Sequence, residues 1–362
     1  MTPPKVESAA AVGLEALLNV DDVEARARAV LPEVVYNFIA GGAADELTVR
    51  WNRERFQDLK LRPRVLRDLG SLDCATTLLG ARMPLPLLLA PTAGHRYSHP
   101  EGELATARAA AGLGVTMVLS SGTHTPVEDV IAAGGRPVWF QLYVLKDRGL
   151  TQALVERVQA AGVTALCVTV DSPLDGARYR QQRLPLAVPP GVTYPHLAGV
   201  REPASIQTLE RVVPANLTWK DIEWLRSITR VPLLLKGILT SEDARAGLGA
   251  GADGLVVSNH GGRCLDTLPA TIEALPAVAD AVAGAAPVLL DGGIRRGTDI
   301  VKALALGASA VMVGRPYVYG LAVAGEAGVA HVLKLLRNEL QMAMALLGCP
   351  DVASIDRRVL WP

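Results

Sequence analysis

The sequence contains few cysteines, no excess of either charge and no long hydrophobic run. Its 362 residues include four cysteines without a CxxC pair, which argues against a disulfide framework or a metal site and favours free thiols in a reducing cytoplasm. The 36 basic and 36 acidic residues cancel, so no nucleic-acid partner is expected. The longest apolar stretch, residues 275–290, is interrupted by prolines, an aspartate and a glycine, whereas a bilayer span needs about 20 mainly apolar residues. Neither a membrane segment nor a secretory leader is therefore expected.

The sequence has instead a repeated unit: a short apolar run, a polar or glycine-rich exit and an amphipathic stretch. Runs that are apolar on both faces and bounded by turn residues predict buried parallel strands. Eight alternations of strand and helix predict an α/β fold, the TIM (β/α)8 barrel. The eight runs are Leu85–Ala90, Thr116–Ser121, Val138–Tyr143, Ala165–Asp171, Val231–Gly237, Gly254–His260, Pro287–Gly293 and Ala310–Pro316.

Other segments lie around the predicted barrel. Residues 1–22 are expected to be a flexible N-terminal extension, and residues 23–362 a single barrel domain. A leading helix is predicted over residues 23–40 and closing helices over 326–347. The long Pro- and Gly-rich loop after the fourth strand, residues 181–222, is interpreted as a mobile lid over the barrel mouth, with an insertion that has no role as the alternative.

Helix starts are also visible in the sequence. Thr125 precedes Pro126 and a glutamate at the third helical position, a pattern typical of a capped helix. Thr240 is followed by Ser241, Glu242 and Asp243, which offers a capping hydroxyl and acids in the first turn.

Polar residues follow nearly every predicted strand, although the strands themselves are apolar. The functional residues of a barrel lie at the carboxyl ends of its strands, so these side chains are expected to share one mouth. In chain order they are Thr92 and Ala93, Ser120, Gln141 and Tyr143, Thr169 and Asp171, Lys236, Ser258 and His260, Asp291, Gly314 and Arg315.

Glycine and arginine dominate the last two exits. The stretch DGGIRRG covers residues 291–297, and GRP covers 314–316. Glycines let the backbone approach a phosphate, arginines supply charge, and the next helix begins with free N–H groups. The loops after strands seven and eight are the usual phosphate site of this fold, so a phosphate-bearing cofactor is expected here.

The segment SNHGGRCLD, residues 258–266, carries the strongest catalytic signal. His260 can act as a general base near neutral pH, and Arg263 can hold a carboxylate by a two-point pair. Asp171 can orient and stabilise the imidazole, and Lys236 places a fixed positive charge at the mouth.

Together these motifs resemble the FMN-dependent L-2-hydroxy acid oxidase and dehydrogenase family. The likeness extends from about residue 31 to about residue 349, strongest in FQLYV, TVDSP, LLKG, SNHGGRCLD, DGGIRRGTDIVKALALGA and VGRP. It implies that residues 23–362 form an FMN-binding domain that oxidises a 2-hydroxy acid to the 2-oxo acid. Two rival readings are another FMN barrel enzyme such as an isomerase, and a flavin-binding scaffold without catalysis.

The resemblance also implies roles. His260 would be the base, Asp171 would stabilise its charged form, and Lys236 would lie beside the flavin's N1–C2 carbonyl edge. Arg263, Arg178 and Tyr143 would bind the substrate. The remaining residues would hold the flavin, its ribityl chain and its phosphate: Thr92, Ala93, Ser120, Gln141, Thr169, Ser258, Asp291, Gly293, Arg295, Gly314 and Arg315.

Two positions depart from the family pattern. Phe38 stands where many relatives have a tyrosine that helps to bind the carboxylate, so one hydroxyl donor is lost. Gly122 stands where plant glycolate oxidases have a tryptophan, which should open the pocket to a substrate larger than glycolate, such as L-lactate.

The electron acceptor is less sharply indicated. Ala93 is compatible with reaction with O2 to give H2O2, but alanine also occurs in a dehydrogenase of the family. The oxidase is favoured, with a quinone- or protein-linked dehydrogenase as the alternative. The free cysteines indicate a cytoplasmic location, and by resemblance the protein is expected to be a homotetramer.

Overall fold

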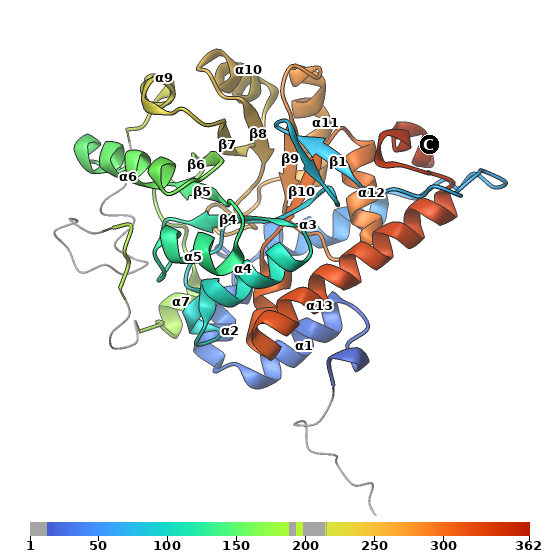
Figure 1. Cartoon of the computed structure of the whole chain (residues 1–362), viewed down its shortest axis with the longest axis horizontal. Helices are drawn as coiled ribbons and strands as arrows, with labels where there is room; N and C mark the ends of the chain where they lie inside the picture. Colours follow the sequence, from blue (N-terminus) through green and yellow to red (C-terminus); the bar gives the residue numbers. More distant parts are fainter. Residues whose placement is uncertain (1–12, 188–192, 198–213, 215) are drawn as a thin grey trace, which may run out of the picture.

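A closed barrel of eight parallel strands forms the centre of the computed structural model, which describes residues 13–187, 193–197, 214 and 216–362 (Figure 1). Each strand lies in one of the eight predicted runs, and only β7 extends one residue beyond its run, so the (β/α)8 prediction is confirmed. The barrel order is β10-β3-β4-β5-β6-β7-β8-β9. The strands are β3 (Leu87–Leu89), β4 (Thr116–Ser120), β5 (Trp139–Leu142), β6 (Ala165–Thr169), β7 (Leu233–Ile238), β8 (Gly254–Val257), β9 (Val288–Asp291) and β10 (Ala310–Val313).

Helices follow the strands and cover the barrel. Because alternate strand residues point to opposite faces, Leu89 and Leu235 face the helical layer, whereas Leu88 and Leu234 fill the barrel interior. Both sets are apolar, which explains the continuous hydrophobic runs in the sequence. The covering helices are α4 (Gly102–Gly112), α5 (Val127–Gly134), α6 (Arg148–Ala160), α9 (Trp219–Ile228), α10 (Ser241–Gly249), α11 (Thr271–Val282), α12 (Gly297–Ala305) and α13 (Arg315–Leu347).

A short hairpin that the sequence analysis did not predict closes the amino end of the barrel. Strand β1 (Thr76–Leu78) pairs with β2 (Ala81–Met83) in antiparallel register. Leu78 and Met83 pack into the interior cluster of the barrel. Strands of three residues give too short a pattern for period-based recognition, which explains the omission.

The segment before the barrel differs from its prediction. The single leading helix predicted over 23–40 is wrong: α1 (Val20–Val30) and α2 (Glu33–Ala40) are separated at Leu31 and Pro32. Proline restricts the residue before it to extended backbone, which ends α1, and Pro32 then caps α2. A further helix, α3 (Leu47–Asp58), was not predicted. Of the extension expected over 1–22, residues 1–12 lie outside the described residues, and the rest contains the 3-10 turn η1 (Leu14–Ala16) and the start of α1.

One of the two predicted caps is correct. Thr240 Oγ1 accepts the Asp243 N–H at the start of α10, as expected. At α5 the cap residue is Pro126, and the Thr125 hydroxyl instead donates to Glu103 Oε2 at 2.9 Å. Glu103 is buried, so its carboxylate is costly without hydrogen bonds. The first N–H of α5, that of Val127, already has an acceptor, His196 Nε2 at 3.1 Å, so the Thr125 hydroxyl is not required as a cap.

The closing helix α13 is interrupted by non-helical backbone at Ala324 and Gly325, so its second part matches the helices predicted over 326–347. Among the described residues it is the one helix long and apolar enough to cross a membrane by length and composition alone. Half of the most apolar stretch of this helix is buried within the protein, and a helix that packs against a protein core can meet the same length and composition criterion.

The loop predicted as a lid lies largely beyond the described residues. Residues 188–192, 198–213 and 215 are outside them, so the lid stays a prediction. The described parts contain a short helix, α7 (Tyr179–Arg183), and the first residues of α9, which begins at Trp219 rather than after residue 222.

Candidate active site

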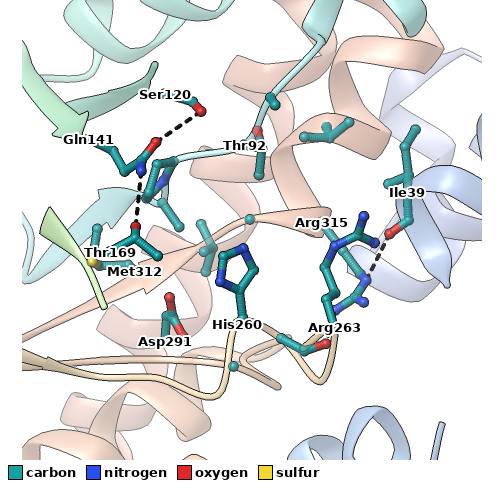
Figure 2. Close-up of a pocket in the computed structure, with 18 of the residues that line it drawn as sticks. Ile39, Thr92, Ser120, Gln141, Thr169, His260, Arg263, Asp291, Met312 and Arg315 are labelled. Atoms are coloured by element: carbon teal, nitrogen blue, oxygen red, sulfur yellow. Dashed lines mark hydrogen bonds between the residues drawn. The ribbon is translucent and has the colours of Figure 1, made fainter. Parts of the chain in front are cut away.

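A cavity opens at the carboxyl ends of the barrel strands, and most of the predicted site residues line it (Figure 2). Asp171 and Ser258 lie behind the lining and contact His260, which belongs to it. Gly122 is buried and does not line the cavity; its N–H is accepted by Ser120 Oγ at 3.1 Å. The predicted residues that do line it are Phe38, Thr92, Ala93, Ser120, Gln141, Tyr143, Thr169, Arg178, Lys236, His260, Arg263, Asp291, Gly293, Arg295, Gly314 and Arg315.

His260 follows β8 in left-handed backbone, at φ +57°. This turn places its Nδ1 2.9 Å from Asp171 Oδ1, at the end of β6. Ser172 Oγ donates to the same carboxylate oxygen at 3.0 Å and lies 3.2 Å from His260 Nδ1. With Nδ1 directed to the carboxylate, Nε2 is the nitrogen available to exchange a proton with a bound molecule.

The pKa of His260 is raised to about 9. Burial lowers it, but the neighbouring Cys264 sulfur and the Asp171 carboxylate raise it more. The pKa of Asp171 is itself lowered: burial opposes its charge, while His260 and Lys236 stabilise it. The neutral imidazole is therefore a strong proton acceptor, and its fraction increases as the pH rises towards 9.

This pKa predicts how activity depends on pH. Only the neutral imidazole can accept a proton, so kcat/KM should rise about tenfold per pH unit up to about pH 9 and then level off. Asp171→Asn removes a negative charge that raises the pKa of His260, so the inflection should move to lower pH while the plateau falls. Initial rates measured from pH 5 to 10 test both statements. An unchanged inflection in the variant contradicts the coupling.

Lys236, from β7, is held between two neighbours. Its Nζ donates to Ser258 Oγ at 2.9 Å and lies 3.3 Å from Asp291 Oδ2 at the end of β9. Although burial disfavours its charge, Asp291 and Asp171 raise the pKa of Lys236. A permanent ammonium group therefore lies at the floor of the cavity.

Three polar side chains from neighbouring strands form a hydrogen-bonded row. Gln141 Oε1 accepts from Ser120 Oγ at 3.1 Å, and Gln141 Nε2 donates to Thr169 Oγ1 at 3.0 Å (Figure 2). The two bonds fix the orientation of the amide. The row presents donors and acceptors to one side of the cavity, as recognition of a flat heteroaromatic ring requires.

Three partly buried arginines have no carboxylate partner among the ion pairs of the described residues. Arg263 Nη1 donates to the carbonyls of Phe38 and Gly41, both at 2.9 Å. Arg315 donates to the Ile39 carbonyl (Figure 2). It also donates to the carbonyls of Gly41 and Gly261. Burial lowers the pKa of Arg295, and its Nε is buried without a hydrogen-bond partner in the described structure. A guanidinium stays charged in proteins, so this arrangement calls for bound anions.

The neighbours of Arg263 strengthen this conclusion. Burial lowers the pKa of Arg263, and the charges of Arg178 and Arg315 lower it further. Arg178 donates from Nε to the Arg263 carbonyl at 3.1 Å and pairs with Asp175 at 2.8 Å. A carboxylate bound between Arg263 and Arg178 would relieve the repulsion.

Tyr143 and Thr92 complete the predicted set. Tyr143 lines the cavity, and burial together with the Asp171 charge raises its pKa, so its hydroxyl remains a hydrogen-bond donor. Thr92 Oγ1 lies 2.7 Å from His95 Nε2 and also hydrogen-bonds Tyr317. Tyr317 in turn donates to the Ala90 carbonyl at 2.9 Å, which fixes the backbone that leads to Ala93.

Several site features were missed in the sequence. Ser172 and Cys264 flank the His260–Asp171 pair, and both are visible in the quoted motifs TVDSP and SNHGGRCLD. The carbonyls of α2 that hold Arg263 and Arg315 carry no side-chain signal, so no pattern could have revealed them. Leu174 and Asp175 also line the cavity, from the chain just after β6.

Fold and site together define a barrel enzyme that binds a phosphorylated ring cofactor and an anionic substrate beside a general base. The model of the FMN-dependent dehydrogenase family matches residues 27–362, and the chain belongs to this family. An L-lactate oxidase of Nostoc sp. is 47% identical over 358 residues, 95% of this chain and 98% of that one. Glycolate oxidase 1 of Zea mays is 46% identical over 350 residues, 94% and 95% of the two chains. A solved mandelate oxidase with (S)-4-hydroxymandelic acid has 42% identity and a TM-score of 0.89, covering 94% and 98%. The protein is thus an FMN-dependent 2-hydroxy acid oxidase or dehydrogenase.

The residues present fit FMN. Arg295 and Arg315, after β9 and β10, offer unpaired charge for the phosphate, and the row Ser120–Gln141–Thr169 with Lys236 offers polar groups for the ring. When bound, FMN accepts the two electrons of the substrate.

Arg295 provides a direct test of the phosphate site. Arg295→Gln removes the charge but keeps hydrogen-bonding groups, so FMN should bind about 10- to 100-fold more weakly, as loss of a charged hydrogen bond of about 1.5–3 kcal/mol implies. Riboflavin, which lacks the phosphate, serves as the control ligand and should bind both proteins alike. Quenching of flavin fluorescence gives both dissociation constants. If the variant bound riboflavin and FMN equally weakly, Arg295 would not act on the phosphate.

Proposed function

We propose that the protein oxidises an L-2-hydroxy acid larger than glycolate, such as L-lactate, to the 2-oxo acid, with O2 as acceptor and H2O2 as product. The observation that carries the proposal is the pairing at one cavity of the His260 base, backed by Asp171, with the guanidinium of Arg263, which has no carboxylate partner in the described chain. The base and the carboxylate-binding group must act on adjacent atoms of one substrate. His260 and Arg263 both come from the loop after β8, which places them at the same cavity (Figure 2).

The residues divide the work as follows. Arg263 and Arg178 bind the substrate carboxylate, and Tyr143 hydrogen-bonds the substrate. His260 Nε2 takes a proton from the substrate, and the Asp171 carboxylate stabilises the resulting imidazolium through Nδ1. Lys236 keeps a positive charge beside the ring that receives the electrons.

Apolar lining near the arginines supports a substrate with a side chain. Phe38 and Leu174 both line the cavity, and the Phe38 ring lies 5.4 Å from the Arg263 guanidinium carbon. Gly122 does not line the cavity, so the size argument depends on Phe38 and Leu174 instead. The similarity to an L-lactate oxidase and to a mandelate oxidase also favours a substrate larger than glycolate.

Anaerobic mixing of the flavin-loaded protein with glycolate, L-lactate, longer L-2-hydroxy acids and L-mandelate tests the proposal. We expect bleaching of the visible flavin bands, fastest with a substrate larger than glycolate. D-lactate is the control and should bleach it little. Preference for glycolate would reject the substrate class, and no bleaching with any 2-hydroxy acid would reject the reaction.

Phe38→Tyr tests the missing hydroxyl. The added group can donate to the substrate carboxylate, and a hydrogen bond to a charged group contributes about 1.5–3 kcal/mol. We expect KM for L-lactate to fall about tenfold with a smaller change in kcat, measured by steady-state kinetics. A raised KM would show that the hydroxyl does not reach the carboxylate.

The acceptor is tested by admitting air to the substrate-reduced protein. Ala93 lines the cavity, and alanine at this position is compatible with re-oxidation of the flavin by O2. Re-oxidation in step with H2O2 formation supports the oxidase. Re-oxidation only by a quinone or a redox protein supports the dehydrogenase. Similarity to a soluble mutant of a membrane-associated (S)-mandelate dehydrogenase from Pseudomonas putida keeps it as the second candidate.

A cytoplasmic location and a homotetramer complete the proposal. Four free thiols, three of them buried, are consistent with a reducing compartment. Light scattering coupled to size-exclusion chromatography measures the assembly, and a mass of one chain would reject the tetramer.

A further inference from the structure

A compact group of metal-binding atoms lies behind the catalytic base. Asp171, His260 and Cys264 each offer one ligand atom, and the three atoms lie within 4.8 Å of one another. All three residues are partly exposed, so an ion can reach them. None of the proposed catalytic steps uses Cys264.

Ser172 Oγ supplies a fourth corner. It lies 3.0 Å from Asp171 Oδ1, 3.2 Å from His260 Nδ1 and 3.1 Å from Cys264 Sγ. The fourth measured edge, from Nδ1 to Oδ1, is 2.9 Å. The ligand atoms of a tetrahedral zinc ion are about 3.4 Å apart, which follows from bonds of about 2.0–2.3 Å. Displacements of a few tenths of an ångström along these edges would admit the ion.

Charge and an unused acceptor favour the same occupant. A thiolate and a carboxylate together balance a divalent cation, and the sulfur selects zinc over magnesium or calcium. Asp171 Oδ2, the other oxygen of the carboxylate, is buried and has no hydrogen-bond partner in the described structure, so the carboxylate can shift towards an ion without breaking a hydrogen bond at Oδ2.

We propose that Asp171, His260 and Cys264, with Ser172 Oγ at the fourth corner, form an inhibitory Zn²⁺ site. Zinc bound to Nδ1 replaces the contact between His260 and Asp171, and the thiol proton of Cys264 is released to solvent. The neutral imidazole then uses its one lone pair for zinc and carries its hydrogen on Nε2. Nε2 therefore cannot accept the substrate proton, while the Arg263 and Arg178 clamp remains open to substrate. Zinc should therefore lower kcat without competing with the substrate.

Only the inhibitory consequence rests on the proposed function, so binding is measured separately. Equilibrium dialysis of the FMN-loaded protein against Zn²⁺ should show one tight equivalent. Co²⁺ at the same site should give a thiolate charge-transfer band in the difference spectrum. Cys264→Ser should weaken zinc binding about 100-fold, as loss of a ligand implies, and abolish the cobalt band. Cys349→Ser, which alters a buried thiol on another part of the chain, is the matched control and should behave as the parent.

Kinetics then test the consequence, with catalase present so that peroxide cannot oxidise the thiol. Each variant is compared with its own zinc-free rate. In the parent, zinc should lower kcat about tenfold or more and leave KM within about twofold. EDTA should restore the rate, and Cys264→Ser should resist zinc.

Three results would overturn the site: no tight equivalent in the parent, equal binding by Cys264→Ser, or a cobalt complex without the thiolate band. Asp171→Asn gives a second measurement that does not depend on Cys264 and should also weaken binding. Binding without inhibition would overturn the inhibitory role. A protein that binds zinc but reduces its flavin with no 2-hydroxy acid would refute the proposed function and leave the site intact.

Discussion

His260→Ala is expected to leave FMN bound and to slow flavin reduction by an L-2-hydroxy acid about 10,000-fold, the upper range for loss of a general base. The imidazole is the group whose raised pKa and contact with Asp171 prepare it to take the substrate proton. Most of the residues assigned to the flavin, such as Gln141, Lys236 and Arg315, stand on or directly after other strands, so binding of the cofactor should persist. Stopped-flow absorbance under anaerobic conditions measures the rate.

The backbone at this position needs its own control. His260 has φ +57°, a conformation that alanine adopts less readily than asparagine. His260→Asn therefore keeps the turn and removes the base. If His260→Asn reduced its flavin at the parent rate, the proton would have to leave by another route.

Arg263→Lys is expected to lower kcat/KM about 100-fold or more, mainly through KM. The Arg263 side chain already donates through Nη1 to the carbonyls of Phe38 and Gly41, and its remaining donors can face the cavity. Lysine has one nitrogen, so it cannot satisfy those carbonyls and also form a planar two-point pair with a carboxylate. Loss of a partner from a buried charged pair costs about 2–5 kcal/mol.

Steady-state kinetics measure this effect, with Arg55→Lys as the control. Arg55 is an exposed arginine of α3 that pairs with Asp58, and its replacement should leave both constants unchanged. Parent-like kinetics in Arg263→Lys would show that the carboxylate binds elsewhere. Flavin content is measured in each variant, so that loss of cofactor is not mistaken for loss of the clamp.

The barrel was predictable from the sequence because its strands are buried on both faces. Continuous apolar runs such as 165–171 and 287–293 give a clear pattern, and polar residues at their ends mark the mouth. The break between α1 and α2 was missed because the apolar pattern continues across it, although Pro32 marks it locally. The cap at Thr125 was wrong because Glu103 and His196, far away in the chain, compete for the groups that decide it.

The sequence allowed the catalytic side chains of the site to be predicted, but not the neighbouring residues that orient them. His260, Arg263 and Lys236 stand in motifs with recognisable chemistry. The neighbours that tune them act through contacts between distant segments: Ser172 and Cys264 are 92 residues apart, and their polar atoms meet at 3.1 Å. Such contacts become visible only when β6 and β8 are placed in space.

Backbone carbonyls of α2, near the start of the chain, accept hydrogen bonds from active-site arginines that come much later in the sequence. Arg315 donates to the Ile39 carbonyl across 276 residues of sequence, and Arg263 reaches Phe38 across 225. Contacts between such distant residues form slowly, because a long stretch of chain must first be brought together. During synthesis, the Arg315 guanidinium cannot be positioned until β10 and the start of α13 have left the ribosome. Acquisition of yellow colour by a nascent or refolding chain would therefore report the final closure of the molecule.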